Sequence, residues 1–122
     1  MTLNEYQRSA MTTCMDSSRN FAYMMNNLVA EVGEFAGKVA KAQRKGKIKF
    51  NENGDLVCNF DSIEEMREFW NELKKEAGDI LWQHAGLCEV MDWDLETIGA
   101  ENLQKLASRQ RRGKIDGEGD NR

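Results

Sequence analysis

Proline is absent from this sequence of 122 residues, so the residue that most strongly interrupts helices is missing. Long stretches instead consist of Ala, Leu, Met, Glu, Lys, Gln and Arg, which favour helix by propensity. The length is enough for one hydrophobic core and too short for two. We therefore expect an all-α fold in one domain, residues 1–113, followed by a polar tail, residues 114–122.

Cysteines and long apolar runs are also scarce. Cys14, Cys58 and Cys88 are odd in number and form no C-x-x-C pair, so neither a disulfide framework nor a thiolate zinc site is indicated. No apolar run follows a basic start, and no stretch approaches the ~20 apolar residues that a membrane span requires. We expect a cytoplasmic protein without a membrane partner.

An excess of positive charge is missing as well, since the formal net charge is −4. Affinity for polyanions comes mainly from Lys and Arg near phosphates, so a nucleic-acid partner is not indicated. Two local basic patches nevertheless suit a small phosphorylated ligand. They consist of Lys41, Arg44, Lys45, Lys47 and Lys49, and of Lys105, Arg109, Arg111, Arg112 and Lys114.

Capping residues and hydrophobic periodicity predict four helices. The first begins at the Thr2 cap and ends near Met15, and the second begins after a cap within residues 16–18 and ends at Gly46. The third runs from Asp61-Ser62 to about residue 90, and the fourth runs from Asp94 to Gly113. Their predicted buried residues include Met25, Val29 and Val32 in the second helix and Leu95, Leu103 and Leu106 in the fourth.

The segment from Lys47 to Phe60 interrupts the helical pattern. Apolar and polar residues alternate there around Asn53-Gly54, a dipeptide that favours tight turns, so we predict a short hairpin or ordered loop between the second and third helices. The residues after Gly113 are too polar for a core, and we expect either a disordered end or a strap that covers a ligand.

The most informative feature is an acidic motif that occurs twice. Glu31-Val32-Gly33-Glu34 lies in the second predicted helix and Glu76-Ala77-Gly78-Asp79 in the third. In each motif two carboxylates stand three residues apart and therefore project from one helix face, where they repel each other. Each motif also holds a glycine inside a helix, at a cost of ~1 kcal/mol relative to alanine, and close approach of the two helices would explain it.

If the two helices run antiparallel, the four carboxylates converge near the middle of both. A hard divalent cation offsets their repulsion, because magnesium prefers oxygen ligands. Each pair alone is more often a solvated surface pair, but two matched pairs in neighbouring helices favour a metal site. The predicted ligands are Glu31, Glu34, Glu76 and Asp79.

These two motifs resemble those of the MazG-type all-α nucleoside triphosphate pyrophosphohydrolases, which carry an E-E-x-x-E segment and a later E-x-x-D segment. The resemblance runs from about Phe21 to the C-terminus. Ala30 replaces the leading glutamate, and Leu73 stands where the family often has a lysine. The end of the chain, from Asn102 to the Gly119-Asp120-Asn121-Arg122 segment, is similar to small MazG-like proteins of phages and bacteria.

The resemblance implies a four-helix bundle of the all-α NTP pyrophosphatase type that uses Mg²⁺, or Mn²⁺ in its place. Water would be added between the α and β phosphates of an NTP or dNTP, giving the monophosphate and pyrophosphate. Glu34 is the candidate to accept a proton from that water instead of only holding the metal. The resemblance also implies a homodimer or homotetramer with substrate pockets near subunit contacts.

Candidate substrate-binding residues lie on two helices. Asn102, Lys105 and Arg109 share one face of the fourth helix and suit phosphate or sugar oxygens, although a solvated face fits equally well. Lys38 lies one to two turns beyond Glu34 and is a further phosphate contact. Candidates near the base are less specific and are Asn20, Tyr23, Met24, Asn27, Trp82 and His84.

Two other functions stay open at this stage. One keeps the fold and changes the substrate to phosphoribosyl-ATP or a guanosine alarmone. The other is a non-catalytic helical module whose acidic face and basic tail bind a protein partner. Magnesium binding that depends on the carboxylates separates the module from the enzymes.

Overall fold

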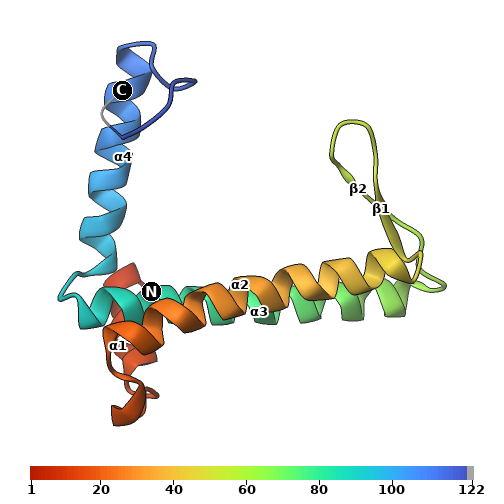
Figure 1. Ribbon diagram of the computed structural model, residues 1–122, viewed down its shortest axis with the longest axis horizontal. Coiled ribbons are helices and arrows are strands. Elements are labelled where there is room, and N and C mark those ends of the chain that lie inside the picture. Colours follow the sequence, from red (N-terminus) through yellow and green to blue (C-terminus); the bar gives the residue numbers. More distant parts are fainter. Residues whose placement is uncertain (121–122) are drawn as a thin grey trace.

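A computed structural model describes residues 1–120 of the chain, and the predicted motif residues Asn121 and Arg122 lie outside the described part. Within residues 1–120 the fold is all-α apart from one two-stranded hairpin (Figure 1). The predicted all-α class, the four α-helices and the hairpin between the second and third of them are confirmed. The elements in order are α1 (Leu3–Met11), the 3-10 helix η1 (Asp16–Ser18), α2 (Phe21–Arg44), β1 (Ile48–Phe50), β2 (Leu56–Cys58), α3 (Ile63–Val90) and α4 (Leu95–Arg111).

Local capping chemistry accounts for most helix ends. Thr2 and Glu5 form both halves of the predicted capping box, and the left-handed backbone of Gly46 (φ 71°) and Gly113 (φ 67°) follows the ends of α2 and α4. The predicted cap of α2 within residues 16–18 is wrong. Those residues form a separate 3-10 turn, and the side chain of Asn20 instead accepts the Tyr23 amide at 2.9 Å. α1 ends at Met11, earlier than the predicted end near Met15, and Thr12 is its C-cap residue.

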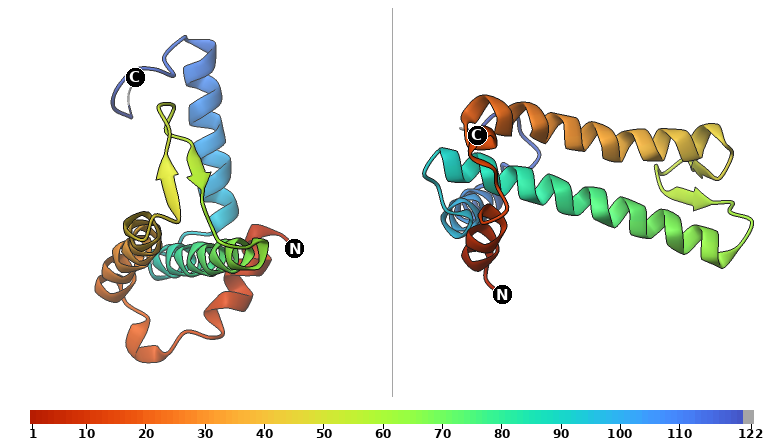
Figure 2. Two further views of the ribbon diagram at one scale, coloured as in Figure 1. Left: turned by 90° about the vertical axis from the view of Figure 1, so that its right-hand side faces the viewer. Right: turned by 90° about the horizontal axis from the view of Figure 1, so that it is seen from below.

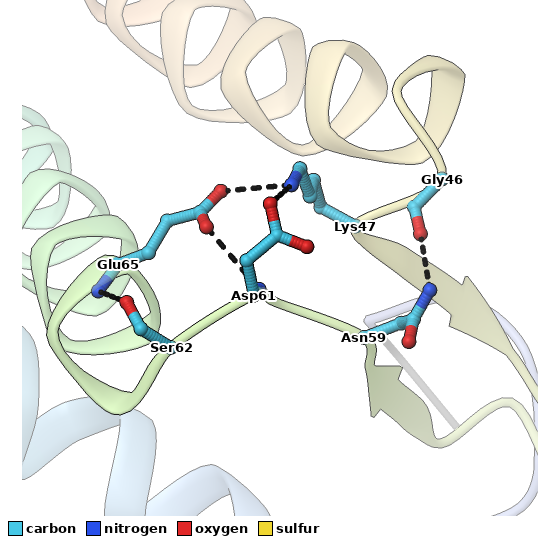
Figure 3. Close-up of polar contacts among 6 residues, drawn as sticks. All are labelled: Gly46, Lys47, Asn59, Asp61, Ser62 and Glu65. Atoms are coloured by element: carbon cyan, nitrogen blue, oxygen red, sulfur yellow. Dashed lines mark hydrogen bonds and ion pairs between the residues drawn. The ribbon is translucent and has the colours of Figure 1, made fainter.

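The hairpin is held at its base by polar contacts with the start of α3 (Figure 3). Lys47 Nζ lies 2.8 Å from Asp61 Oδ2 and 3.1 Å from Glu65 Oε1. Asn59 Nδ2 donates to the Gly46 carbonyl at 3.1 Å, while the Ser62 hydroxyl accepts the Glu65 amide. These contacts set the direction in which the hairpin leaves the helices.

α2 and α3 form a long antiparallel pair, and the other elements are attached near its ends (Figures 1 and 2). α1 crosses α3, and α4 packs mainly on α1. The buried cluster where these three helices meet is formed by Met11, Ala85, Cys88 and Leu95. The four helices therefore form an open arrangement, because α4 and the hairpin project away from the α2–α3 pair (Figure 2). None of the helices in residues 1–120 is long and apolar enough to span a membrane.

Several residues predicted to be buried are exposed. In α2 the exposed fractions are 42% for Met25, 70% for Val29 and 50% for Val32, whereas Met24 is fully buried. Leu103 and Leu106 of α4 are also exposed, and only Leu95 of its predicted core residues is buried. The reason is geometric. The pattern correctly indicates an apolar stripe, but α2 turns a neighbouring stripe toward α3.

Gly33 and Gly78 do not mark a close approach of the helices, which corrects the explanation proposed above for the two motifs. Apart from the backbone of its own helix, a Cβ added at either position meets no atom of residues 1–120 within 4 Å. Close approach occurs at Gly86 instead, where an added Cβ would overlap the Met24 sulfur and lie 2.7 Å from its methyl carbon. Gly86 is thus the glycine of α3 against which α2 packs.

Removing the cap of α4 should destabilise the protein in a pH-dependent way. Hydrogen bonds from the Thr97 amide and hydroxyl lower the pKa of Asp94, so this contribution is present above the unfolded pKa and is lost as the pH falls through the folded value. We expect Asp94→Ala to lower the melting temperature by about 4–8 °C at neutral pH and progressively less below pH ~3.8. Thermal unfolding across this range, with Asp116→Ala in the exposed tail as control, checks it; a difference that does not depend on pH would contradict it.

Candidate metal centre

Three carboxylates from the two long helices converge between them. Glu31 and Glu34 come from adjacent turns of α2, and Glu76 faces them from α3. Each offers one carboxylate oxygen, and these three oxygens lie within 4.8 Å of one another. The antiparallel pairing predicted from the sequence therefore brings three of the four predicted ligands to one place.

Because the cluster is partly buried, its negative charge destabilises the fold when no cation is bound. Glu31 Oε2 and Glu76 Oε2 are both buried and have no hydrogen-bond partner among residues 1–120, and Glu76 as a residue is only 8% exposed. Burial first, and then the charges of Glu34, Asp79 and Glu76, raises the pKa of Glu31. Buried oxygens of this kind are normally satisfied by donors or ions, and oxygen-only donors suit a hard cation such as Mg²⁺. The residues present fit such an ion.

Asp79 lies at the edge of the cluster. Its side chain is exposed and is not among the three converging carboxylates, yet its charge contributes to the raised pKa of Glu31. It also faces α1, because burial and then the Asp79 charge raise the pKa of Tyr6. Asp79 is thus close to the cluster on the side where α1 packs.

Lys38 contacts a carboxylate of the cluster directly. Its Nζ lies 2.6 Å from Glu72 Oε2 and 3.0 Å from Glu76 Oε1, and these contacts raise the pKa of Lys38 and lower that of Glu72. The bridge occupies one oxygen of Glu76 and leaves the other in the cluster. Sequence reasoning missed Glu72, although its position one turn before Glu76 was a usable signal.

Lys38 should therefore affect metal binding even without substrate. We expect Lys38→Met to weaken Mg²⁺ binding about 10-fold or more, because Glu76 loses the partner that orients it. Calorimetry with Mg²⁺ alone measures this, and Lys41→Met, at an exposed position one turn on, is the control. Unchanged Mg²⁺ affinity together with a higher KM for nucleotide would instead favour the direct phosphate contact predicted from the sequence.

The helix that carries the predicted substrate residues, α4, projects away from the α2–α3 pair that carries the carboxylates (Figure 1). Lys105 Nζ and Arg109 Nη2 each lie 3.1 Å from Asp120 Oδ1, and Arg109 is only 4% exposed. Hydrogen bonds from Lys105 and Arg109 lower the pKa of Asp120. Asn102 is exposed on the same helix. The segment after Gly113 thus returns to α4 as far as Asp120.

Most residues suggested for base recognition have structural contacts instead. Met24 is fully buried, and Asn20 caps α2. Asn27 donates to the Tyr23 carbonyl, and Trp82 Nε1 donates to the Ala10 carbonyl of α1 at 3.1 Å. These contacts hold helices in place and point to no base pocket.

Comparison with known proteins agrees with this geometry. A family model described as the MazG nucleotide pyrophosphohydrolase domain matches residues 19–113, a range that includes all three converging carboxylates. The chain is also similar to the Gene 37 protein of Mycobacterium phage L5, with 35% identity over 130 aligned residues that cover 100% of both chains. No solved structure matches the chain.

Proposed function

The chain belongs to the MazG nucleotide pyrophosphohydrolase family, and from this premise we propose that it hydrolyses a nucleoside triphosphate, NTP or dNTP, to the monophosphate and pyrophosphate in a Mg²⁺-dependent reaction. The observation that carries the proposal is the set of three converging carboxylates, two of which have a buried oxygen without a partner in the described part of the chain. A cytoplasmic nucleotide pool is the proposed source of substrate.

The positions of the carboxylates and of Lys38 suggest the role of each. Glu31, Glu34 and Glu76, with Asp79 at the edge, would hold Mg²⁺, or Mn²⁺ in its place. The bound ion supplies positive charge that offsets the charge of the phosphate oxygens. Glu34 is the exposed member of the cluster, so its carboxylate can both reach the ion and accept a proton from the attacking water. Lys38 orients Glu76 through their ion pair.

In the proposed reaction the water oxygen forms a bond to one of the two phosphorus atoms that the α–β bridging oxygen joins, and the bond from that phosphorus to the bridging oxygen breaks. The other phosphate group leaves with the bridging oxygen, so the products are the monophosphate and pyrophosphate, and Glu34 takes one proton from the water. Asn102, Lys105 and Arg109 are proposed to bind phosphate or sugar oxygens of the nucleotide. We also propose that the protein works as a homodimer or homotetramer, because one chain leaves much apolar surface exposed.

A direct assay tests the proposal. Purified protein is incubated with each NTP and dNTP in Mg²⁺ and in EDTA, and monophosphate and pyrophosphate are quantified. We expect both products in equal amounts, only with the metal. Turnover of phosphoribosyl-ATP or a guanosine alarmone alone would change the substrate. Folded protein that neither turns over any of these nor binds Mg²⁺ would be a non-catalytic module.

A further inference from the structure

A third buried oxygen without a partner lies in the α2–α3 pair, outside the carboxylate cluster. Gln83 of α3 is only 6% exposed, and its Oε1 atom is buried without a hydrogen-bond partner among residues 1–120. In this part of the chain the other buried side-chain atoms without a partner belong to Glu31, Glu76 and Arg109. A bound cation would account for the oxygens of Glu31 and Glu76. The amide oxygen of Gln83 lacks such an explanation, and buried acceptors are normally satisfied.

Gln83 lies on the face of α3 that carries the carboxylates. It follows Glu76 by seven residues and Asp79 by four, and both spacings return to the same side of an α-helix. At ~1.5 Å per residue it is about 10 Å further along α3 than Glu76 and about 6 Å further than Asp79. One turn beyond it, Gly86 contacts the buried side chain of Met24. Gln83 therefore lies between the carboxylate cluster and the point where α2 and α3 pack through Gly86.

The adjacent turn of α2 does not supply the missing donor. In the antiparallel register fixed by the contact between Met24 and Gly86, Asn27 is the residue of α2 across from Gln83. The side-chain nitrogen of Asn27 donates to the Tyr23 carbonyl of its own helix at 3.0 Å. The oxygen of Gln83 is thus available to an N–H or O–H group of a ligand.

The two sides of the carboxylate cluster differ in charge. On the side away from Gln83, a hollow at the base of the hairpin is lined by Lys38, Lys41, Lys45 and Lys47, together with Glu65, Glu68 and Glu72. Two of these glutamates are held in ion pairs with lysines, so positive charge is in excess among the lining side chains. On the other side, Asn27 and Gln83 are uncharged. The lysine side suits the phosphates of a nucleotide, and the amide side suits its nucleoside.

A buried neutral acceptor discriminates strongly between ligands. A ligand group that donates a hydrogen bond gives the oxygen the partner that it lacks in the free protein. A ligand that places an acceptor or a methyl group there leaves the oxygen unpaired, and its binding is weaker. A nucleoside offers donors of this kind at the hydroxyl groups of its sugar and at the N–H groups of its base.

We propose that Gln83 determines the specificity of the nucleotide site, by accepting a hydrogen bond from an N–H or O–H group of the nucleoside whose phosphates are held at the carboxylate cluster. The inference deepens the proposed function, on which it rests. It also explains why a polar side chain is buried next to the cluster without a partner in the free protein. Sequence reasoning missed Gln83, because a single glutamine in a helix carries no signal of burial.

Thermal unfolding in EDTA tests whether the oxygen of Gln83 is unpaired in the free protein. Gln83→Met keeps the length of the side chain and removes its polar atoms, so we expect the melting temperature to rise by about 2–5 °C. Gln43→Met makes the same change at an exposed position of α2 and should shift it by less than about 1 °C. A lower melting temperature of Gln83→Met would show that the amide has a structural partner, and would overturn the inference.

Binding without turnover tests the contact with the nucleoside. Triphosphates with a methylene group in place of the α–β bridging oxygen are titrated with Mg²⁺, in ribose, deoxyribose and dideoxyribose forms of each base. The wild type should prefer the nucleotide that carries the donor over the form that lacks it by at least about 10-fold. Gln83→Met should reduce this preference below about 3-fold, whereas Gln43→Met should keep it. The series also identifies whether the donor belongs to the sugar or to the base. An equal loss of affinity for every member would overturn the inference.

Calorimetry with Mg²⁺ alone separates Gln83 from the metal ligands. Gln83→Met should change the affinity for Mg²⁺ by less than about 3-fold, and a loss of 10-fold or more would show that Gln83 acts through the ion instead. The assay of hydrolysis then distinguishes the two proposals. Selective binding that depends on Gln83, in a protein that hydrolyses no nucleotide, would retain the role of Gln83 and reject the activity. Hydrolysis with the same nucleotide preference in Gln83→Met would retain the activity and reject that role.

Discussion

Glutamine in place of Glu31 is expected to abolish magnesium binding and, at the same time, to raise the melting temperature of the metal-free protein. One oxygen of Glu31 is buried without a partner among Glu34, Glu76 and Asp79. Glutamine keeps the shape and removes the charge. We expect Mg²⁺ affinity and nucleotide hydrolysis to fall at least about a hundredfold, and the melting temperature in EDTA to rise by about 2–6 °C.

The stability difference between Glu31→Gln and the wild type should also depend on pH, in a direction that can be checked. The pKa of Glu31 is raised in the folded state, so its ionised form opposes folding, and this penalty develops as the pH rises from the unfolded pKa to the folded one. The stabilisation by glutamine should therefore be full at neutral pH and vanish below pH ~4. In Mg²⁺ the order of the two melting temperatures should reverse, so that the wild type is the more stable protein, because Mg²⁺ stabilises only the protein that binds it.

Calorimetry with Mg²⁺ and thermal unfolding in EDTA measure the two effects separately. Glu52→Gln, in the exposed turn of the hairpin, removes the same charge far from the cluster and should change neither quantity. A Glu31→Gln protein that unfolds at a lower temperature in EDTA and still binds Mg²⁺ would show that Glu31 has a structural role instead.

Alanine at Gly86 should destabilise the protein, whereas alanine at Gly78, two turns earlier in α3, should stabilise it. An added Cβ at Gly86 overlaps the end of the Met24 side chain, which is fully buried and cannot move into solvent. Overpacking costs about 1–3 kcal/mol, against about 1 kcal/mol gained in helix propensity. A Cβ added at Gly78 meets no atom of another element within 4 Å among the described residues, so only the gain of about 1 kcal/mol applies.

Chemical denaturation of the two variants measures these free energies of unfolding. The pair is well matched, because both glycines lie in the interior of the same helix and receive the same methyl group. In a Met24→Ala background the same Gly86→Ala change should cost less than in the wild type, since the overlapping atoms are then absent. Equal effects of Gly78→Ala and Gly86→Ala would mean that α2 and α3 do not approach each other most closely at Gly86.

The convergence of the carboxylates was predictable from the sequence to a large degree. Two acidic pairs at three-residue spacing, joined by a segment with a turn dipeptide, implied that the helices return side by side, and the structure brings Glu31, Glu34 and Glu76 together. Glu72 was missed, because its role depends on a Lys38 contact across the two helices. The role of Lys38 as a phosphate contact stays a prediction, and in the folded chain its partners are the carboxylates of Glu72 and Glu76.

By itself the sequence determined the helices, most of their ends, the hairpin turn and the family, since caps, turn residues and periodicity act over a few neighbouring residues. Which apolar stripe is buried was decided only in the tertiary structure. Met24 and Met25 are equally apolar, but the choice between them depends on how α2 rotates against α3, and that rotation is set by the sum of many distant contacts. The same sum of contacts makes α4 project away from the α2–α3 pair that carries the carboxylates, with Leu103 and Leu106 exposed.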